Sequence, residues 1–457
     1  MTRRTLLWPL LSLVVVFAIS TPTTLARDAR DRPNFVLIVA DDLGYGDVGC
    51  YGSEINPTPH IDALARVGVR FTDFHSAGPM CSPTRAAMLT GQYQQRFGER
   101  FDGPLSETDD WDHGLPRSAV TFAEVLKTAG YTSACYGKWH LGYQPPWLPP
   151  AHGFDDFRGL ASGDGDHHTH VSRSGRADWW HNDAIEMQSG YTAELLTGHA
   201  VDFMERCHDR PFCLYVPHLA IHFPWQGPDD PPQRQVGINY ADDKWGIIPD
   251  PGNVSPHVRA MIAAVDRSVG AIVAAIERLQ IDQNTVVIFT SDNGGYLTYG
   301  DNFRNISSNG PLRDQKGSLY EGGHRVPAII VWPGMIEPDV SSATAHSTDL
   351  LPTLAQLAGA DMDAVSSDGV SLAPLLLDKA ALPERTLFWR SRRGRAVRHG
   401  PWKLYASGGP PELYHLDDDL GEQRDLAAQH PQLVQVLNSR WHAWEDDVNR
   451  SAQEIDE

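Results

Sequence analysis

Four short apolar runs, rich in β-branched side chains, constrain the fold of this chain more than any other feature. They lie at 34–40, 212–216, 285–290 and 328–332. Continuous runs of this kind are typical of strands that are buried on both faces of a parallel sheet. Apolar residues at helical spacing occupy 257–279 and 347–357, and Ser347 is the expected N-cap of the second helix. We therefore predict an α/β fold with a large, mostly parallel central sheet sandwiched by helices.

The pattern changes after Leu377. Short strand-like segments separated by turn residues occupy 386–415, and a helical pattern follows Pro431. This order predicts a small antiparallel sheet with a closing helix. A chain of 457 residues is long enough for a main domain, which we place at 32–377, and a C-terminal α+β subdomain at 378–457. We also expect long surface loops at 144–183 and 226–256.

The N-terminal segment has the pattern of an export signal. Arg3 and Arg4 precede an apolar run at 6–19, and small residues follow at 24 and 26. This order is typical of a cleavable signal peptide, which we place at 1–26, with a membrane anchor or a buried helix as the alternatives. We expect an exported protein, periplasmic or secreted, or one in a lysosomal-type lumen if the source is eukaryotic. No other segment is long and apolar enough to predict a transmembrane span in the mature chain.

The charge of the chain excludes one class of partner. The sequence holds 58 acidic and 38 basic residues, a formal net charge of −20. Such a surface repels phosphate backbones, so we expect no nucleic-acid partner. It would also repel a sulfated polymer unless basic groups gather locally. The chain has five cysteines, an odd number that leaves at least one thiol unpaired, and a bond between Cys207 and Cys213 stays open.

Acidic side chains follow two of the predicted strands. Asp41 and Asp42 come after the run at 34–40, and Asp292 and Asn293 come after the run at 285–290. Ligands of open parallel sheets bind beyond the carboxyl ends of the strands. Three carboxylates and an amide meeting there would form an oxygen-rich cage that suits Ca²⁺ or Mg²⁺ rather than zinc. The alternative is that these residues only cap the turns that follow.

Cys81 lies at the expected start of a short helix. Ser82 is a natural N-cap, Pro83 suits the first helical position, and Gly91 ends the helix. The helix N-terminus would stabilise an anion and lower the pKa of the thiol. Arg85, one turn further on, could clamp an oxyanion or orient a nucleophile. An ordinary capped helix with a buried cysteine is the alternative.

Four more basic side chains are candidates for the same site. Lys138 and His140 are two residues apart, so an extended chain would point both the same way. A cation beside a titratable base suits anion binding with proton transfer, whereas a solvated lysine and a core histidine are the alternative. His222 and Lys316 follow predicted strands, and each is ordinary by itself.

Five ordered blocks of the sequence together resemble the formylglycine-dependent sulfatases of the alkaline-phosphatase superfamily. The blocks are Pro33–Asp47, Cys81-Ser-Pro-Thr-Arg85 with Leu89-Thr-Gly91, Gly137–Gly142, Ser291–Gly294 and Lys316–Gly323. The resemblance covers nearly the whole mature chain and is closest to arylsulfatase A and the N-acetylgalactosamine-6-sulfatases. It implies an alkaline-phosphatase-like fold and a sulfuric ester hydrolase, with 32–377 as the catalytic domain.

The resemblance implies that a formylglycine-generating enzyme oxidises Cys81 to formylglycine during maturation. One hydroxyl of the hydrated aldehyde attacks the sulfur of a sulfate ester, and ionisation of the other then expels sulfate. A divalent cation, Ca²⁺ in preference to Mg²⁺, would neutralise a sulfate oxygen and acidify the attacking hydroxyl. The metal ligands that the resemblance implies are Asp41, Asp42, the modified Cys81, Asp292 and Asn293.

The catalytic set that the resemblance implies is Cys81, Arg85, Lys138, His140, His222 and Lys316. The arginine steadies the modified cysteine, and the two lysines bind sulfate oxygens. The first histidine takes the proton that triggers elimination, and the second contacts the sulfate and, with Lys316, protonates the departing alkoxide. His222 is chosen over His218 because it lies two residues before a proline, as in the family.

The substrate implied is a sulfate ester, either of a carbohydrate or of an aryl group, and we expect a sulfated carbohydrate. Trp179 and Trp180 could stack on sugar rings, although core packing is the alternative. The histidine-rich cluster at 164–170 is expected to face the substrate, with a transition-metal site as its alternative. Two other functions stay open. One is a phosphodiesterase or phosphonate monoester hydrolase of the same superfamily, and the other is a glycan-binding protein that is inert because Cys81 stays a thiol.

Overall fold

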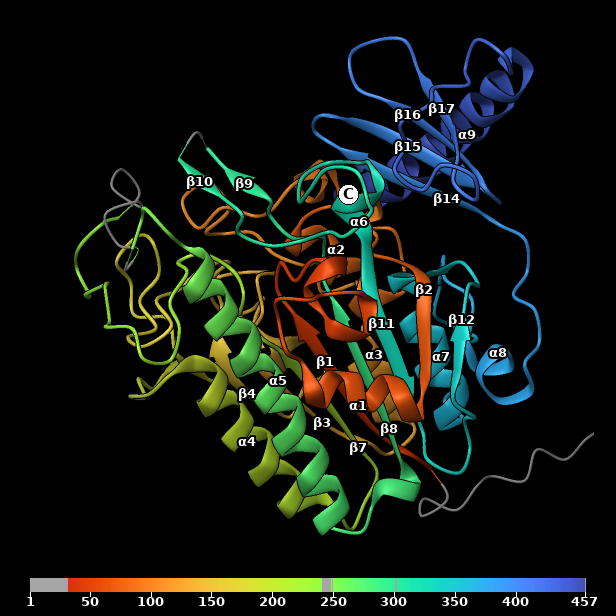
Figure 1. Cartoon of the computed structure of the whole chain (residues 1–457). Coiled ribbons are helices and arrows are strands. Elements are labelled where there is room, and N and C mark those ends of the chain that lie inside the picture. Colours follow the sequence, from red (N-terminus) through yellow and green to blue (C-terminus); the bar gives the residue numbers. More distant parts are fainter. Residues whose placement is uncertain (1–31, 241–247, 249, 301, 457) are drawn as a thin grey trace, which may run out of the picture.

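The computed structural model describes residues 32–240, 248, 250–300 and 302–456 (Figure 1). The predicted signal peptide at 1–26 lies outside these residues. Across the described ranges, no helix has the length and apolar character needed to cross a membrane. The central sheet crosses the middle of the view (Figure 1). The C-terminal sheet lies beyond the edge of the central sheet at which the strand 34–40 ends (Figure 1).

A sheet of 11 strands organises the molecule, in the order β12-β2-β11-β8-β1-β7-β3-β4-β5-β6 with β13 paired to β2. The four apolar runs form β11, β8, β1 and β7, which are neighbours at the centre of this sheet, as their complete burial predicts. The strands are β1 (Asn34–Ala40), β2 (Val69–His75), β3 (Thr132–Lys138), β4 (Asp156–Leu160), β5 (Trp180–His181), β6 (Ala184–Ile185), β7 (Phe212–Pro217), β8 (Thr285–Ser291), β11 (Arg325–Val331), β12 (Asp339–Ser341) and β13 (Ala345–His346). A separate hairpin joins β9 (Thr298–Tyr299) to β10 (Phe303–Arg304).

The sheet is mixed and mostly parallel, which confirms the predicted fold class. β1 pairs in parallel with both β7 and β8, and β3 pairs in parallel with β7 and β4. β11 runs antiparallel to both of its neighbours, β8 and β2. A strand buried on both faces has the same apolar pattern in either direction, so the sequence did not indicate this reversal.

Helices cover both faces of the central sheet. Phe35, Leu37 and Val39 of β1 pack in a core with α2, α3, α7 and α8. Val36 and Ile38 point the opposite way and pack with α1, α4 and α5, the last two of which lie side by side (Figure 1). These helices are α1 (Pro59–Val67), α2 (Cys81–Thr90), α3 (Phe122–Thr128), α4 (Thr192–Cys207), α5 (Ser255–Arg278), α7 (Leu350–Ala358) and α8 (Ala373–Asp378).

A second sheet and a long helix form the C-terminal part of the chain, as the pattern after Leu377 predicts. The antiparallel strands β14 to β17 pair in sequence order. Trp441 and Trp444 of the helix pack on this sheet, and Trp444 stacks on Phe388 with ring centroids 5.0 Å apart. The elements are β14 (Thr386–Ser391), β15 (Gly394–His399), β16 (Trp402–Ala406), β17 (Glu412–His415) and α9 (Pro431–Asp456).

Two local expectations differ from the structure, and the structure also answers the open question of a disulfide. Ser347 does not cap α7, because its hydroxyl accepts the N–H of Ala77 at 3.0 Å, and the residue lies in a 3₁₀ turn before the helix. The segment 144–183 is not one loop, since it contains β4 and β5. All five cysteines lie in the described part and are free thiols, so Cys207 and Cys213 do not pair.

A buried ionic network joins the C-terminal sheet to the central one. Nζ of Lys403, on β16, lies 2.9 Å from a carboxylate oxygen of Glu321 and 2.9 Å from one of Glu422, and none of the three side chains is exposed. Arg398, on β15, contacts Asp73 of β2 at 2.7 Å. Burial opposes ionisation, yet Lys403 holds the pKa of Glu321 well below its usual value, and Arg398 does the same for the pKa of Asp73. The two sheets are therefore held together by charges that depend on one another.

Replacing Lys403 by alanine removes the cation that two buried carboxylates share, and in the described structure only Glu321 keeps another, Arg325 at 3.2 Å. Removal of one partner of a buried ion pair costs about 3–5 kcal/mol, so we expect Lys403→Ala to lower the free energy of unfolding by that order. Lys379→Ala is the control, because Lys379 pairs with Glu337 on the surface, where solvent screens the charges. Urea unfolding followed by circular dichroism measures both variants. Equal midpoints for the two would contradict a stabilising role of the network.

Candidate active site and metal centre

Two neighbouring strands end in acidic residues at the same edge of the sheet. Ala40 at the end of β1 lies directly opposite Ser291 at the end of β8. The N–H of Asp292 donates to the carbonyl of Ala40 at 3.1 Å, and the N–H of Asp42 donates to Oδ1 of Asp292 at 3.2 Å. The parallel register therefore brings together the acids that follow the two strands, Asp41 among them.

The acidic side chains converge on one buried point. Carboxylate oxygens of Asp41, Asp42 and Asp292 lie within 4.8 Å of one another. Asn293 donates from Nδ2 to Oδ1 of Asp42 at 2.8 Å, whereas its own buried Oδ1 has no hydrogen-bond partner in the described structure. Such acceptors are rare in proteins, and carboxylate and amide oxygens are the ligands of hard cations. These four residues therefore fit a metal ion, for which Asn293 offers a free ligand atom.

Three buried cations offset the charge of these acids. The pairs are Arg85–Asp292 at 2.8 Å, Lys138–Asp41 at 2.5 Å and Lys316–Asp42 at 2.5 Å. Burial and the charge of Asp292 raise the pKa of Asp41. Burial by itself would also raise the pKa of Asp292, but Arg85 and the two lysines hold that pKa below its usual value. The cations outweigh burial at Asp292, whereas at Asp41 burial and the neighbouring carboxylate outweigh the cations.

Cys81 lies between an acid and a cation of this cluster. It is the first residue of α2, which ends at Gly91 in the left-handed conformation, as predicted. Sγ lies 3.4 Å from Oδ1 of Asp41 and 3.1 Å from Nζ of Lys316. The side chain is buried and lines the cavity described below. The start of α2 therefore places the sulfur beside the acids at the ends of β1 and β8.

Two expectations about Cys81 are wrong. Met80 rather than Ser82 is the N-cap residue of α2, because the Ser82 hydroxyl accepts the N–H of Leu105 at 3.1 Å. The pKa of the unmodified thiol is not lowered. Burial and the charge of Asp41 raise it to about 12, against the opposite effect of the two lysines. The helix N-terminus does not outweigh desolvation here.

His140 reaches the site by a different backbone path from the one expected. β3 ends at Lys138, and His140 has a φ of 56°, so the chain between them is not extended. Nε2 of His140 lies 3.0 Å from the carbonyl oxygen of Leu105. Gly163 packs so closely on the ring that a Cβ there would lie 2.2 Å from Cε1. The ring is thus held on two sides within the cavity that Cys81 lines.

His222, and not His218, reaches the acidic cluster. Nε2 of His222 lies 3.9 Å from Oδ2 of Asp42, and a ring nitrogen of His222 lies within 4.8 Å of ligand atoms of Asp41 and Cys81. His218 is completely buried and does not appear among the residues that line the cavity. All ten site residues predicted from the sequence therefore lie around one point.

His140 and His222 differ from Lys316 in protonation. Burial, reinforced by Lys138, lowers the pKa of His140 and that of His222 well below the usual value. Burial opposes the charge of Lys316 as well, yet Asp42 and Cys81 raise its pKa well above the usual value. At neutral pH the two rings are therefore neutral, and the lysine carries a proton.

A cavity of about 470 Å³ opens above Cys81. Its wall combines aromatic rings with charged groups, namely Tyr143, Phe223, Tyr296, Tyr299, Glu107, Asp164, Arg173, Lys316 and Arg392. The tyrosines and Arg392 are not among the site residues predicted from the sequence. Tyr296 and Tyr299 follow the Asp292-Asn293 pair closely enough to have been suspected, whereas Arg392 comes from the C-terminal sheet and carries no local signal.

The histidine cluster at 164–170 does not face the cavity as a whole. His167, His170 and Trp179 are completely buried, and the Trp179 ring lies 4.2 Å from that of His170. Asp164 does line the cavity and pairs with Arg173 and with the buried Arg234. Core packing rather than sugar stacking therefore describes Trp179.

The centre combines a buried cysteine, an oxygen-rich cage and several cations, an arrangement that suits a hydrolase of tetrahedral oxyanion esters. The family model for sulfatases matches residues 33–360. Human arylsulfatase A is 35% identical, with 89% of this chain and 86% of that protein aligned. Mouse N-acetylgalactosamine-6-sulfatase is 34% identical, with 86% and 75% aligned. The structure of Ps i-CgsB in complex with k-i-k-neocarrahexaose superposes with a TM-score of 0.80 at 30% identity, covering 92% of this chain and 94% of that one. The chain belongs to the sulfatase family and is a sulfuric ester hydrolase.

Gly163→Ala tests the placement of His140. The added methyl group would overlap the ring, and a displacement of about 1 Å can cost on the order of 100-fold in rate, so we expect kcat to fall by that order. Gly198→Ala is the matched control, since a Cβ at this position of α4 meets no atom within 4 Å. Turnover of an aryl sulfate and thermal unfolding are measured for both. A Gly163→Ala enzyme with wild-type kcat would show that this ring position is not needed.

Proposed function

We propose that this sulfatase acts on sulfated carbohydrates through formylglycine formed from Cys81, with Ca²⁺ bound beside it. The observation that carries the proposal is the position of Sγ of Cys81, between Asp41 and Lys316 at the base of the cavity. A formylglycine-generating enzyme would convert this residue. We further propose export directed by residues 1–26, a catalytic domain at 32–377 and a C-terminal subdomain at 378–457.

The acidic cluster supports the cation. Asp41, Asp42, Asp292 and Asn293, with the modified Cys81, would hold it. A divalent cation bound there supplies polarisation of a sulfate oxygen, and hydrated formylglycine supplies a hydroxyl nucleophile. Ca²⁺ suits the site better than Mg²⁺, because protein oxygens alone furnish most of its ligands, whereas Mg²⁺ usually keeps several waters.

Arg85 is proposed to position the nucleophile. Its Nε and a terminal nitrogen contact Asp292, and its other terminal nitrogen donates to the carbonyl of Lys138 at 2.8 Å. The side chain therefore ties α2 to the ends of β8 and β3. With these elements fixed, Lys138 and Lys316 present positive charge where sulfate oxygens gain charge in the transition state.

The protonation states of the basic side chains support separate roles for them. A neutral His140 can accept the proton that is released when the sulfate is expelled. Lys316 holds a proton at Nζ under the same conditions and is placed to protonate the departing alkoxide. His222, also neutral, would contact the sulfate and share with Lys316 the donation of a proton to the departing oxygen.

Two observations support a carbohydrate substrate. Rings of Tyr143, Tyr296 and Tyr299 line the cavity, and aromatic rings beside polar groups suit the apolar faces and hydroxyls of sugars. The similar protein Ps i-CgsB has been solved in complex with k-i-k-neocarrahexaose, a saccharide ligand.

Matched aryl esters test the proposed function. Protein produced with a formylglycine-generating enzyme is expected to hydrolyse 4-nitrophenyl sulfate faster than 4-nitrophenyl phosphate. Cys81→Ala should abolish the sulfate activity, and mass spectrometry should find formylglycine in the peptide that contains residue 81. Preference for the phosphate ester would favour the phosphodiesterase alternative. An unmodified thiol in protein from the native source would favour the inert glycan-binding alternative.

Removal of the cation should expose the repulsion among the three carboxylates. We expect EDTA to lower the melting temperature and Ca²⁺ to restore it more fully than Mg²⁺. A cation at about 100 times its Kd stabilises the folded state by about 2.7 kcal/mol. In Asp292→Asn the response to Ca²⁺ should be greatly weakened, whereas Asp282→Asn, at a half-buried position outside the acidic cluster, should keep it. A melting temperature that neither EDTA nor Ca²⁺ changes would rule out a stable cation site here.

A further inference from the structure

We propose that the turn between β14 and β15 forms a second anion-binding site, in which Arg392 and Arg393 hold a further sulfate or carboxylate of the substrate. This inference rests on the proposed function and narrows its substrate class. The favoured substrate is a polyanionic sugar chain, with an anionic group on a ring next to the one that carries the scissile sulfate.

The turn is fixed at the mouth of the active-site cavity. The N–H of Arg392 donates to the carbonyl of Asp102 at 3.3 Å, and Nε of Arg390 contacts the carboxylate of Asp102 at 2.9 Å. The Arg392 side chain packs on Gly103, where a Cβ would lie 3.1 Å from its Nε. Its guanidinium therefore lies along the wall of the same cavity that Cys81 lines.

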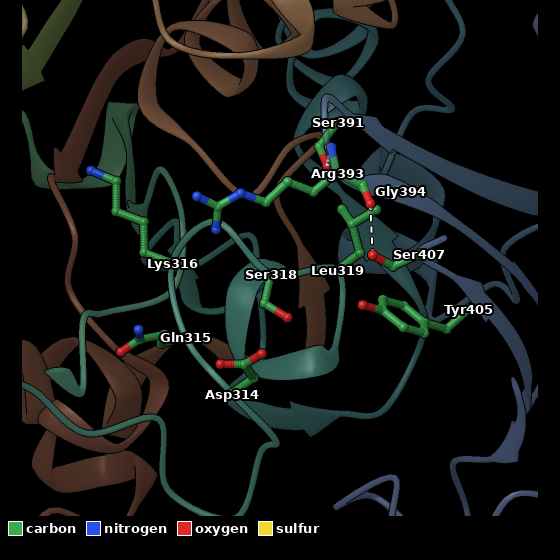
Figure 2. A pocket seen from close by; sticks show the side chains of 11 residues that line it. Asp314, Gln315, Lys316, Ser318, Leu319, Ser391, Arg393, Gly394, Tyr405 and Ser407 are labelled. Atoms are coloured by element: carbon green, nitrogen blue, oxygen red, sulfur yellow. Dashed lines mark hydrogen bonds between the residues drawn. The ribbon is translucent and has the colours of Figure 1, made fainter. Parts of the chain in front are cut away.

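Arg393 lines an adjoining cavity of about 170 Å³ between the 314–319 loop and the C-terminal sheet. Figure 2 shows its side chain extending across this cavity toward Lys316. The hydroxyl of Ser407 donates to the carbonyl of Arg393 at 2.7 Å and so holds the backbone of the turn. Lys316 lines both cavities, so an extended ligand could reach Cys81 and Arg393 together.

The two arginines differ from the others of their sheet. In the described part of the chain, neither guanidinium has an acidic partner, although the protein carries a net charge of −20. Both residues are exposed. The other arginines of β14 and β15 are held by polar partners, in the pairs Arg390–Asp102, Arg395–Asn438 and Arg398–Asp73. The charges at 392 and 393 are thus left available to a ligand.

The chemistry of the turn selects an oxyanion. A guanidinium offers paired N–H groups that match the oxygens of a sulfate or carboxylate. Asp314 and Ser318 lie on the side of the adjoining cavity away from Arg393 (Figure 2). A carboxylate there repels an anion but accepts hydrogen bonds from sugar hydroxyls. The anionic group is therefore expected beside the arginines, and the sugar ring beside Asp314.

The test compares the wild type with an Arg392→Ala/Arg393→Ala double variant on a small ester and on polyanions. The probes are 4-nitrophenyl sulfate, κ-neocarrahexaose with one sulfate per disaccharide, its ι-type counterpart with two, and a chondroitin 6-sulfate hexasaccharide that also carries carboxylates. Where a hexasaccharide is not hydrolysed, its Ki against 4-nitrophenyl sulfate replaces KM. Because hydrogen bonds to charged groups are worth about 1.5–3 kcal/mol, we expect the variant to weaken polyanion binding, relative to the aryl ester, by about tenfold or more.

Arg424→Ala is the control, since it removes one charge from an exposed position of the C-terminal part outside both cavities. Loss confined to the ι-type probe identifies a second sulfate as the ligand, and loss confined to the chondroitin probe identifies a carboxylate. An unchanged ratio for every polyanion, or an equal ratio in Arg424→Ala, would overturn the second site. The second site would also be overturned if the wild-type enzyme bound none of the polyanions more tightly than the aryl ester. Failure of the wild type to hydrolyse 4-nitrophenyl sulfate would instead count against the proposed function.

Discussion

The close approach of three carboxylates at the ends of β1 and β8 governs the rest of the structure. Asp41, Asp42 and Asp292 cannot remain charged in a buried space unless cations are brought to them. Those cations come from α2, from the end of β3 and from the loop that carries Lys316. Segments far apart in the sequence are therefore fixed to one point, and Cys81 is fixed with them.

The C-terminal part supports this point from a second side. Lys403 holds Glu321, which lies five residues after Lys316 and begins α6 (Glu321–His324). Nε1 of Trp389 donates to the carbonyl of Ser76 at 2.7 Å, shortly before Cys81 in the sequence. The C-terminal sheet thus braces both segments that meet at the sulfur. Its β14–β15 turn also borders the cavity through Arg392. The C-terminal sheet therefore both supports the segments that carry the site and forms part of the cavity wall.

Much of this arrangement could be predicted, because it depends on short-range patterns. Continuous apolar runs identified the central strands, and the expectation that β1 and β8 are parallel, which the structure confirms, made the convergence of their acids predictable. The direction of β11 and the capping by Met80 could not be predicted, because each depends on a partner distant in the sequence. The same is true of Lys403 and Arg392. Their surroundings are made by tertiary contacts, and a lysine or arginine in a short strand or turn is ordinarily a solvated residue.

The location of the cations explains how an acidic protein can bind an acidic substrate. The three cations of the acidic cluster are paired with buried acids, and burial protects their interactions from salt. The arginines of the β14–β15 turn are exposed, and salt screens interactions between exposed charges beyond about 10 Å. If both proposals hold, attraction of a polyanion from solution depends on the turn, whereas stabilisation of the reacting sulfate depends on the buried lysines. Ionic strength accordingly acts on capture of the chain at the mouth of the cavity rather than on the chemical step beneath it.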